Sequence, residues 1–516
     1  MNTSQRILAN TVAQYVRIIA GAVLLLYSTR IVLQELGVSD FGLYSLLGSV
    51  LAFMSFLGTA LARSTQRYLS YYTGVGKLES LRGVFLNSLL LHVVVGLALC
   101  GLVMACEPLM FSYIFDITPD RLSQAHILYA ILVAGMFVTI FQAPYMAVFI
   151  AHENIIFISA VYVIAYVMRL AGAFALAWFA TDMRVVIYGI IMVVIPAMET
   201  LAFMWVSYRK YDECRQFCRR EFVSKSMLKE LLGFSGWNIY GAVAILARQQ
   251  GYAVALNHFT GLLYNAGYGI ATQVSGQINN LVYSVMNAVS PVITKSEGSK
   301  DRQRMIYLSV ESSKASFLSF TLIVMPFLFF MEPVLQAWLG EIPSGAWLFT
   351  LAIVLSSMAD SIGAGFRTGI FAIGQIRDFS IQVYTVKMLS IVFSVLFFAL
   401  GWGVAVSILP YFLSEVIGTA QTVAIFGRMT GNGAWSLMRR GFGGTVLPVA
   451  VSAAVCWALR AVTPQGWGLP MVLVAYIIST GFTSLIIYKT ALDERERQLV
   501  LRMLAKFHIP VPAGKR

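Results

Sequence analysis

Basic residues interrupt the apolar stretches of this chain at positions where a lipid bilayer penalises charge. Arg17, Arg169, Arg248 and Lys387 each lie well inside such a stretch. A Lys or Arg at the centre of a membrane helix costs roughly 2.5 to 3.5 kcal/mol on insertion scales, so we expect these side chains to face a water-filled interior rather than lipid. A cavity with this lining would be cationic, which predicts an anionic cargo.

Two further cations and three acids complete the set of candidate residues. Arg30 and Arg367 lie near the ends of their apolar stretches, where a long side chain can extend to the membrane surface, and we count both as candidate substrate ligands. Glu199, Asp360 and Glu415 lie within apolar stretches. These acids leave two interpretations open, namely buried ion pairs with the cations or sites that bind a coupling proton or sodium ion.

Other kinds of chemistry lack the residues that they need. The five histidines are scattered, and no group of His, Cys, Asp and Glu has the spacing of a metal site. Neither a phosphate-binding Gly-rich loop nor a Gly-x-Ser-x-Gly elbow occurs. We therefore predict that the protein is not an enzyme, holds no metal or other cofactor, and depends on its substrate or on a sodium or proton gradient for energy.

The composition defines a membrane protein. Hydrophobic residues make up 58% of the chain and charged residues 12%, and apolar runs long enough to cross a bilayer recur throughout. The formal net charge of +13 would suit a nucleic-acid partner, but membrane proteins collect Lys and Arg in their cytoplasmic loops. We expect no nucleic-acid partner and predict an all-α polytopic protein.

The apolar runs predict about fourteen transmembrane helices. They cover residues 8–33, 41–62, 83–105, 123–150, 155–179, 185–207, 230–254, 262–290, 306–331, 346–372, 379–401, 403–427, 442–461 and 468–489. An even number of spans places both termini on the same side of the membrane.

The charges of the connecting loops predict the orientation. One set of loops is basic and contains Arg63, Arg67, Lys77, Arg82, Arg209 to Lys229, Lys295 to Arg304, and Arg428 to Arg440. The alternate loops are acidic and contain Glu35, Asp40, Glu107, Asp116, Asp120, Asp182, Glu332 and Glu341. Because Lys and Arg stay on the cytoplasmic side, the basic loops and both termini are predicted to be cytoplasmic.

A weak internal repeat suggests how the spans are grouped. Residues 144–159, after the fourth span, align with residues 365–380, after the tenth, and this offset sets Arg169 and Lys387 about one helical turn from equivalent positions. We predict two six-helix lobes, 1–208 and 230–428, related by a parallel pseudo-two-fold axis and joined by a cytoplasmic linker, 209–229. Two additional transmembrane helices (429–490) and a cytoplasmic amphipathic tail (491–516) follow.

The N-terminal region resembles a known family. Arg6, Asn10, Leu36-Gly37, Phe41-Gly42-Leu43-Tyr44 and the segment from Arg63 to Arg67 resemble the polysaccharide-export and O-antigen flippase branch of the MOP superfamily, which also contains the MATE exporters. The resemblance is sharpest over residues 1 to about 90, while the number and grouping of spans extend it over the whole chain.

The resemblance implies a two-lobed flippase of the bacterial inner membrane. Its implied substrate is an undecaprenyl-pyrophosphate-linked oligosaccharide of the kind used for O-antigen and lipopolysaccharide, moved by alternating access, and its implied partners are membrane lipids and glycan-assembly enzymes. Embedded Arg residues suit a pyrophosphate because a guanidinium binds phosphate oxygens in pairs. Two alternatives stay open: a MATE-type cation-coupled multidrug antiporter, which Asp360 and Glu415 would suit, and an integral-membrane polysaccharide polymerase or ligase.

Overall fold

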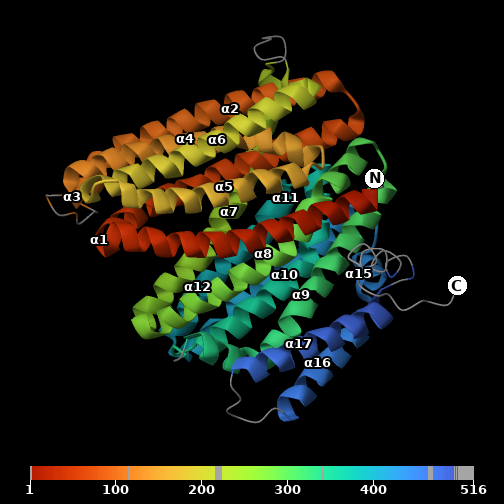
Figure 1. Ribbon diagram of the computed structural model, residues 1–516. Coiled ribbons are helices and arrows are strands. Elements are labelled where there is room, and N and C mark those ends of the chain that lie inside the picture. Colours follow the sequence, from red (N-terminus) through yellow and green to blue (C-terminus); the bar gives the residue numbers. More distant parts are fainter. Residues whose placement is uncertain are drawn as a thin grey trace. The chain divides into compact units, whose positions relative to one another are not determined.

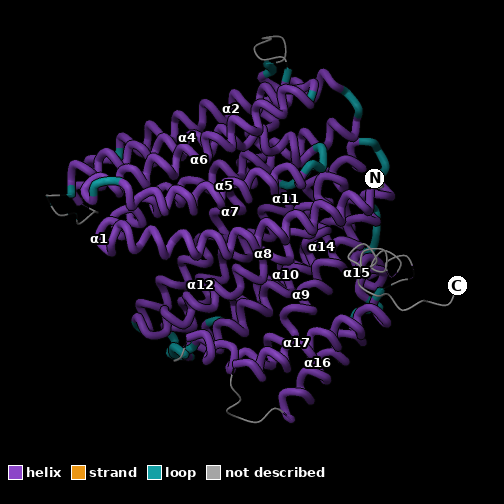
Figure 2. The backbone as a smooth tube through the Cα atoms, in the orientation of Figure 1, coloured by secondary structure: helices purple, strands orange, loops and turns teal. Residues whose placement is uncertain are grey.

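The computed structural model is helical over nearly all of the residues that it describes, which are 3–113, 117, 119, 121–215, 223–339, 342–462, 469–492, 494 and 497 (Figure 1). No strand occurs among them, and short loops connect the helices (Figure 2). Most of the predicted tail, together with Cys218, Asp116, Asp120 and Glu341, lies outside the described residues.

The chain forms two compact units. The N-terminal unit comprises Ala9–Ala242 and Thr294–Asp301, and the C-terminal unit comprises Met1–Leu8, Val243–Ile293 and Arg302–Arg516. The helices α7 (Lys225–Thr260) and α8 (Leu262–Gly298) each contribute residues to both units. The predicted domain boundaries at 208, 230 and 428 stay a prediction.

Helices of membrane-spanning length account for most of the predicted spans. In the described part of the chain, eleven helices are long and apolar enough to cross a bilayer, or up to twelve if a bent pair counts as one span. The other two predicted spans, 41–62 and 262–290, also lie on helices, the second segment of α1 (Thr3–Val75) and α8. Polar residues such as Gln273, Gln277 and Asn279 make α8 less apolar than its neighbours.

The first two predicted spans meet without a loop. Helical geometry continues through α1 except at Gly37, whose φ of 73° and ψ of 171° suit a residue that lacks a Cβ. The acids predicted for a loop here are paired instead: Asp40 with Arg121 at 2.9 Å, and Glu35 with Arg184 at 3.0 Å. A single glycine therefore replaces the expected acidic loop.

The N-terminal unit is built around α4 (Leu122–Ala151), which packs against α2 (Leu78–Ala105) and α6 (Arg184–Lys210). Small residues let α4 and α6 approach closely, since a Cβ on Gly189 of α6 would lie 2.4 Å from the Leu128 side chain of α4. The unit also contains α3 (Glu107–Tyr113), α5 (Ile155–Ala175) and three single-turn helices, η1 (Leu176–Trp178), η2 (Thr181–Met183) and η3 (Asp212–Cys214).

The C-terminal unit is built around α10 (Ala346–Ile373), which packs between α9 (Arg302–Leu339) and α14 (Leu409–Thr430). A Cβ on Gly365 of α10 would lie 2.1 Å from the Ser309 carbonyl oxygen of α9, and the Gly365 N–H donates to Ser313 Oγ at 2.9 Å. These contacts fix α10 firmly against α9. The remaining helices are α11 (Arg377–Phe379), the π-helix η5 (Ser380–Tyr384), α12 (Thr385–Ala399), α13 (Gly403–Ser407), α15 (Ala434–Phe442), α16 (Val446–Val462), α17 (Leu469–Ile486) and the π-helix η6 (Ile487–Ala491).

Candidate functional site

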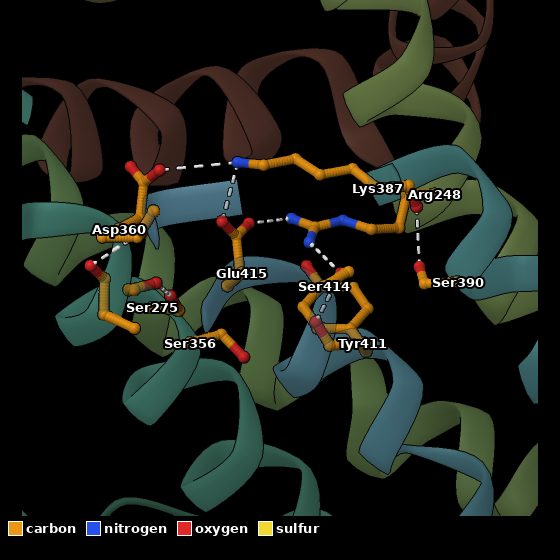
Figure 3. A network of polar contacts seen from close by, with 12 residues as sticks. Arg248, Ser275, Ser356, Asp360, Lys387, Ser390, Tyr411, Ser414 and Glu415 are labelled. Atoms are coloured by element: carbon orange, nitrogen blue, oxygen red, sulfur yellow. Dashed lines mark hydrogen bonds and ion pairs between the residues drawn. The ribbon is translucent and has the colours of Figure 1, made fainter. Parts of the chain in front are cut away.

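Three of the predicted cations meet two of the predicted acids inside the C-terminal unit. Arg248 Nη2 lies 2.5 Å from Glu415 Oε1, and Lys387 Nζ lies 2.7 Å from Glu415 Oε2. Lys387 Nζ also lies 3.4 Å from Asp360 Oδ1, so Lys387 joins the two carboxylates (Figure 3). Arg367 binds both oxygens of Asp360, at 2.7 and 2.9 Å. We call these five charged residues the central ion network.

Neutral groups add further contacts to the central ion network. The Tyr283 hydroxyl donates to Asp360 Oδ2 at 2.6 Å, and Arg248 Nη1 donates to Ser414 Oγ at 3.2 Å. The Arg248 guanidinium also lies over the Tyr411 ring, 4.1 Å from its centroid. A cation held against an aromatic face and a carboxylate has a fixed orientation.

Five helices of the unit contribute the side chains, and local sequence explains the placement of several. Asp360 and Arg367 are seven residues apart on α10, which puts them two turns apart on one face. Tyr411 and Glu415 are four residues apart on α14 and therefore neighbours on its surface. Lys387 follows the π-helix η5, whose wider turn shifts the register of α12, and such turns are frequent at functional sites.

The central ion network carries an excess of positive charge. Three cations, Arg248, Arg367 and Lys387, face two carboxylates, Asp360 and Glu415, which leaves a formal charge of +1. The network is also sheltered, because Arg248 is 5%, Lys387 3% and Glu415 4% exposed. An excess charge in such surroundings interacts strongly with any anion that reaches it, since little water screens it.

The other candidate residues lie in the N-terminal unit. The Arg17 guanidinium lies 5.3 Å from the centroid of the Tyr162 ring, and Gln142 Nε2 donates to Glu199 Oε2 at 3.2 Å. Arg169 lies within electrostatic range of Glu199, but its buried Nε has no hydrogen-bond partner among the described residues. Arg30 is exposed.

The structure thus separates the nine candidate residues into two groups. Arg248, Arg367, Lys387, Asp360 and Glu415 come together in one network, whereas Arg17, Arg30, Arg169 and Glu199 belong to the other unit. Ion pairing, which the sequence left open, is observed for every member of the first group. Whether any of the nine residues binds substrate stays a prediction.

Sequence reasoning missed the neutral members of the network. Tyr411 could have been found from its spacing to Glu415 on one predicted helix, because residues one turn apart share a face, whereas Ser414, the residue directly before Glu415, carried no such signal. Tyr283 carried no comparable signal, because the contact with Asp360 joins two different helices. Within the described part of the chain, no group of three or more His, Cys, Asp and Glu residues could hold a metal ion.

Comparisons with known proteins identify the fold. No family model and no curated protein matches the chain. The crystal structure of a MATE mutant matches with a TM-score of 0.70 at 14% identity, covering 85% of this chain and 98% of that chain. An outward-facing MATE multidrug resistance transporter of the MOP superfamily matches with a TM-score of 0.67 at 15% identity, covering 85% and 97%.

A third solved structure is that of a MOP superfamily transporter from Pyrococcus furiosus, whose binding pocket has a reversed polarity that suggests a different function for that protein. It matches with a TM-score of 0.67 at 14% identity, covering 85% of this chain and 97% of that chain. The chain therefore has the fold of the MATE transporters of the MOP superfamily, a multi-pass membrane fold.

Proposed function

We propose that this protein is a membrane transporter that exports an anionic, lipid-linked cargo, namely an undecaprenyl-pyrophosphate-linked oligosaccharide. It would act in the bacterial inner membrane by alternating access, with both termini cytoplasmic and without enzymatic chemistry. The MATE-type fold supports transport, and the net positive charge of the central ion network supports an anionic cargo.

The charge excess is the observation that carries the proposal. Asp360 and Glu415 carry two negative charges against three positive ones, so the network as a whole keeps a formal charge of +1 although each cation contacts a carboxylate. A pyrophosphate offers several acceptor oxygens and negative charge, and Lys387 would contribute a compact ammonium with three donors while Arg248 contributes a planar fork. The lipid tail would stay in the bilayer while the head group crosses through the protein.

The engagement of the carboxylates argues against a cationic cargo at this site. A cation-coupled drug antiporter needs a carboxylate that a proton, a sodium ion or the drug can occupy in turn. Asp360 already contacts Arg367, Lys387 and Tyr283, and Glu415 contacts Arg248 and Lys387. A cationic drug would have to displace a basic side chain from each carboxylate.

Reconstitution tests the proposal directly. The full chain is placed in liposomes with a fluorescent undecaprenyl-pyrophosphate oligosaccharide, and the fraction of probe that reaches the opposite leaflet is read by chemical quenching of the outer leaflet. We expect Lys387→Met, which makes the network neutral, to reduce the rate at which the probe reaches the opposite leaflet at least about tenfold. The matched control is Lys229→Met, which removes an exposed lysine at the start of α7.

The same liposomes report on energy coupling. Imposed sodium and proton gradients, added one at a time, show whether either ion accelerates movement of the probe. Movement of the probe at the protein-free rate would overturn the proposed function, and so would a Lys387→Met protein as active as the wild type.

Glu199 supports a second candidate, a MATE-type cation-coupled multidrug antiporter. Its carboxylate is 6% exposed, accepts a hydrogen bond from Gln142, and has no ion pair within 4 Å in the described structure. A carboxylate in this state could receive a proton or a cation. This alternative predicts ethidium efflux in the same liposomes, abolished by Glu199→Gln, whereas the anionic-cargo proposal predicts no ethidium movement.

A further inference from the structure

The helix α15 presents one face that no other part of the described protein covers. Trp435 is 79% exposed, and Ser436, Arg439 and Arg440 are exposed as well. At 100° per residue these four positions fall on one side of the helix. We call them the α15 basic face.

The opposite face of α15 is docked on α9. Leu437 is buried, and a Cβ on Gly441 would lie 2.9 Å from the Val310 side chain of α9. At the end of α15, the Phe442 ring packs edge-on against Phe317 of α9, with 5.6 Å between centroids. The basic face therefore points away from the C-terminal unit.

The contacts with α9 place α15 at the level of the membrane surface. The charged residues of α9 near its start are Arg302, Arg304, Glu311 and Lys314, and an apolar run from 315 to 331 follows. Val310 lies within the charged part, and Phe317 lies at the beginning of the apolar run. α15 is also bent by 50° from α16, so it does not simply extend that span. A helix at this depth with an exposed Trp has the character of an interfacial helix.

No acid close by in the sequence balances the charge of the α15 basic face. No Asp or Glu occurs between Arg428 and Val462, and Arg428 at the end of α14 is exposed too. In the part of the chain that the structure describes, Arg439 and Arg440 form no ion pair. Exposed cations at the level of lipid head groups attract anionic phospholipids, and guanidinium groups bind phosphate oxygens in pairs.

We infer that the α15 basic face is a binding surface for the head groups of anionic phospholipids. Arg439 and Arg440 contact the lipid phosphates, and the Trp435 ring lies among the head groups and the first carbons of the acyl chains. This inference is independent of the cargo, because it involves no residue of the central ion network.

Fluorescence quenching by brominated lipids tests the surface. The full chain is placed in nanodiscs that contain the same mole fraction of brominated phosphatidylglycerol or brominated phosphatidylcholine. The chain has nine Trp residues, so the contribution of Trp435 is obtained by subtracting a Trp435→Phe protein. We expect brominated phosphatidylglycerol to quench this contribution at least twofold more strongly than brominated phosphatidylcholine.

Variants of Arg439 and Arg440 separate the effect of their charge on the lipid preference from the effect of their packing. Arg439→Gln/Arg440→Gln should remove the preference for the anionic lipid while leaving quenching by phosphatidylcholine, and Arg439→Lys/Arg440→Lys should keep most of the preference. Trp178, which is 84% exposed in the N-terminal unit, provides the comparison for a Trp away from this surface.

Three results would overturn the inference. They are equal quenching of Trp435 by the two lipids, a preference that persists in the double Gln variant, and no quenching by either lipid. The last result would place α15 in water and point to an acidic soluble partner instead.

Discussion

Removal of individual charges from the central ion network should have effects that follow the net charge left behind. With Glu415→Gln, Arg248, Arg367 and Lys387 face Asp360 alone, and the formal charge rises from +1 to +2. With Lys387→Met, two arginines face two carboxylates and the charge falls to zero. We expect Glu415→Gln to destabilise the protein far more than Lys387→Met.

The observed distances set the size of the expected loss of stability. At 2.7 Å, the attraction between Lys387 and Glu415 is about 6 kcal/mol for an effective dielectric constant of 20, and desolvation offsets part of it. Loss of one partner from a buried pair costs about 3–5 kcal/mol, which is the destabilisation expected for Glu415→Gln. Lys387→Met should cost less than about half of that, because Arg248 and Arg367 still pair with the carboxylates.

A double-mutant cycle measures the interaction between Glu415 and Lys387. The free energy of unfolding is compared in mixed detergent micelles for the wild type, the two single variants and Glu415→Gln/Lys387→Met. The double variant returns the network to +1, so we expect it to be about 1–3 kcal/mol more stable than the sum of the single effects predicts. Glu332→Gln, at an exposed acid of α9, is the control and should have little effect.

Two results would refute the electrostatic reasoning. One is a Lys387→Met protein that is less stable than Glu415→Gln, and the other is a double variant whose effect is the sum of the single effects. Either result would mean that packing rather than charge balance decides the stability of the network. A stable Lys387→Met protein that does not transport the probe would separate cargo binding from folding.

Further predictions concern packing, a second ion pair and a thiol. Gly365→Ala should lower the free energy of unfolding by about 1–3 kcal/mol in denaturant titrations, because the new methyl group would overlap the α9 backbone. Lys295 and Glu153 are 2.8 Å apart and partly buried, and a double-mutant cycle should give a coupling energy of about 1 kcal/mol. Burial raises the pKa of the Cys214 thiol, so this thiol stays protonated at pH 8, and mass spectrometry should find that iodoacetamide modifies Cys214 more slowly than Cys106.

Each of these experiments has an internal control. Gly276→Ala adds a methyl group where no atom lies within 4 Å, and a loss equal to that of Gly365→Ala would contradict the packing explanation. Lys300→Met removes an exposed lysine near Lys295, and zero coupling between Lys295 and Glu153 would show that solvent screens their pair. Equal alkylation rates for Cys214 and Cys106 in the folded protein would show that η3 opens readily.

The helices of this protein could be predicted from its sequence because their cause is local. A run of about twenty apolar residues must be helical to satisfy its backbone in lipid, and every predicted span is helical over most of its described residues. The join at Gly37 was not predicted, because Glu35 and Asp40 suggested a solvated loop. Those acids instead pair with Arg184 and Arg121 from distant parts of the sequence.

The candidate site could be predicted only in part. Charges within apolar stretches singled out Arg248, Lys387, Asp360 and Glu415, because each is costly to bury alone. Which acid pairs with which base depends on the distances between helices, and no local pattern contains them. Arg367 illustrates the limit, since its position near a helix end suggested an anchor at the membrane surface, whereas its two contacts with Asp360 place it within the network.

The break in α1 at Gly37 has a practical consequence for mapping which side of the membrane each part of this protein faces. One residue connects two long hydrophobic segments, so there is no flexible loop between them to accept a reporter enzyme, an epitope or a protease site. Insertions here would force helical turns apart and strain the pairs made by Glu35 and Asp40. Small chemical labels on single cysteines are therefore the suitable probes for this end of the helix.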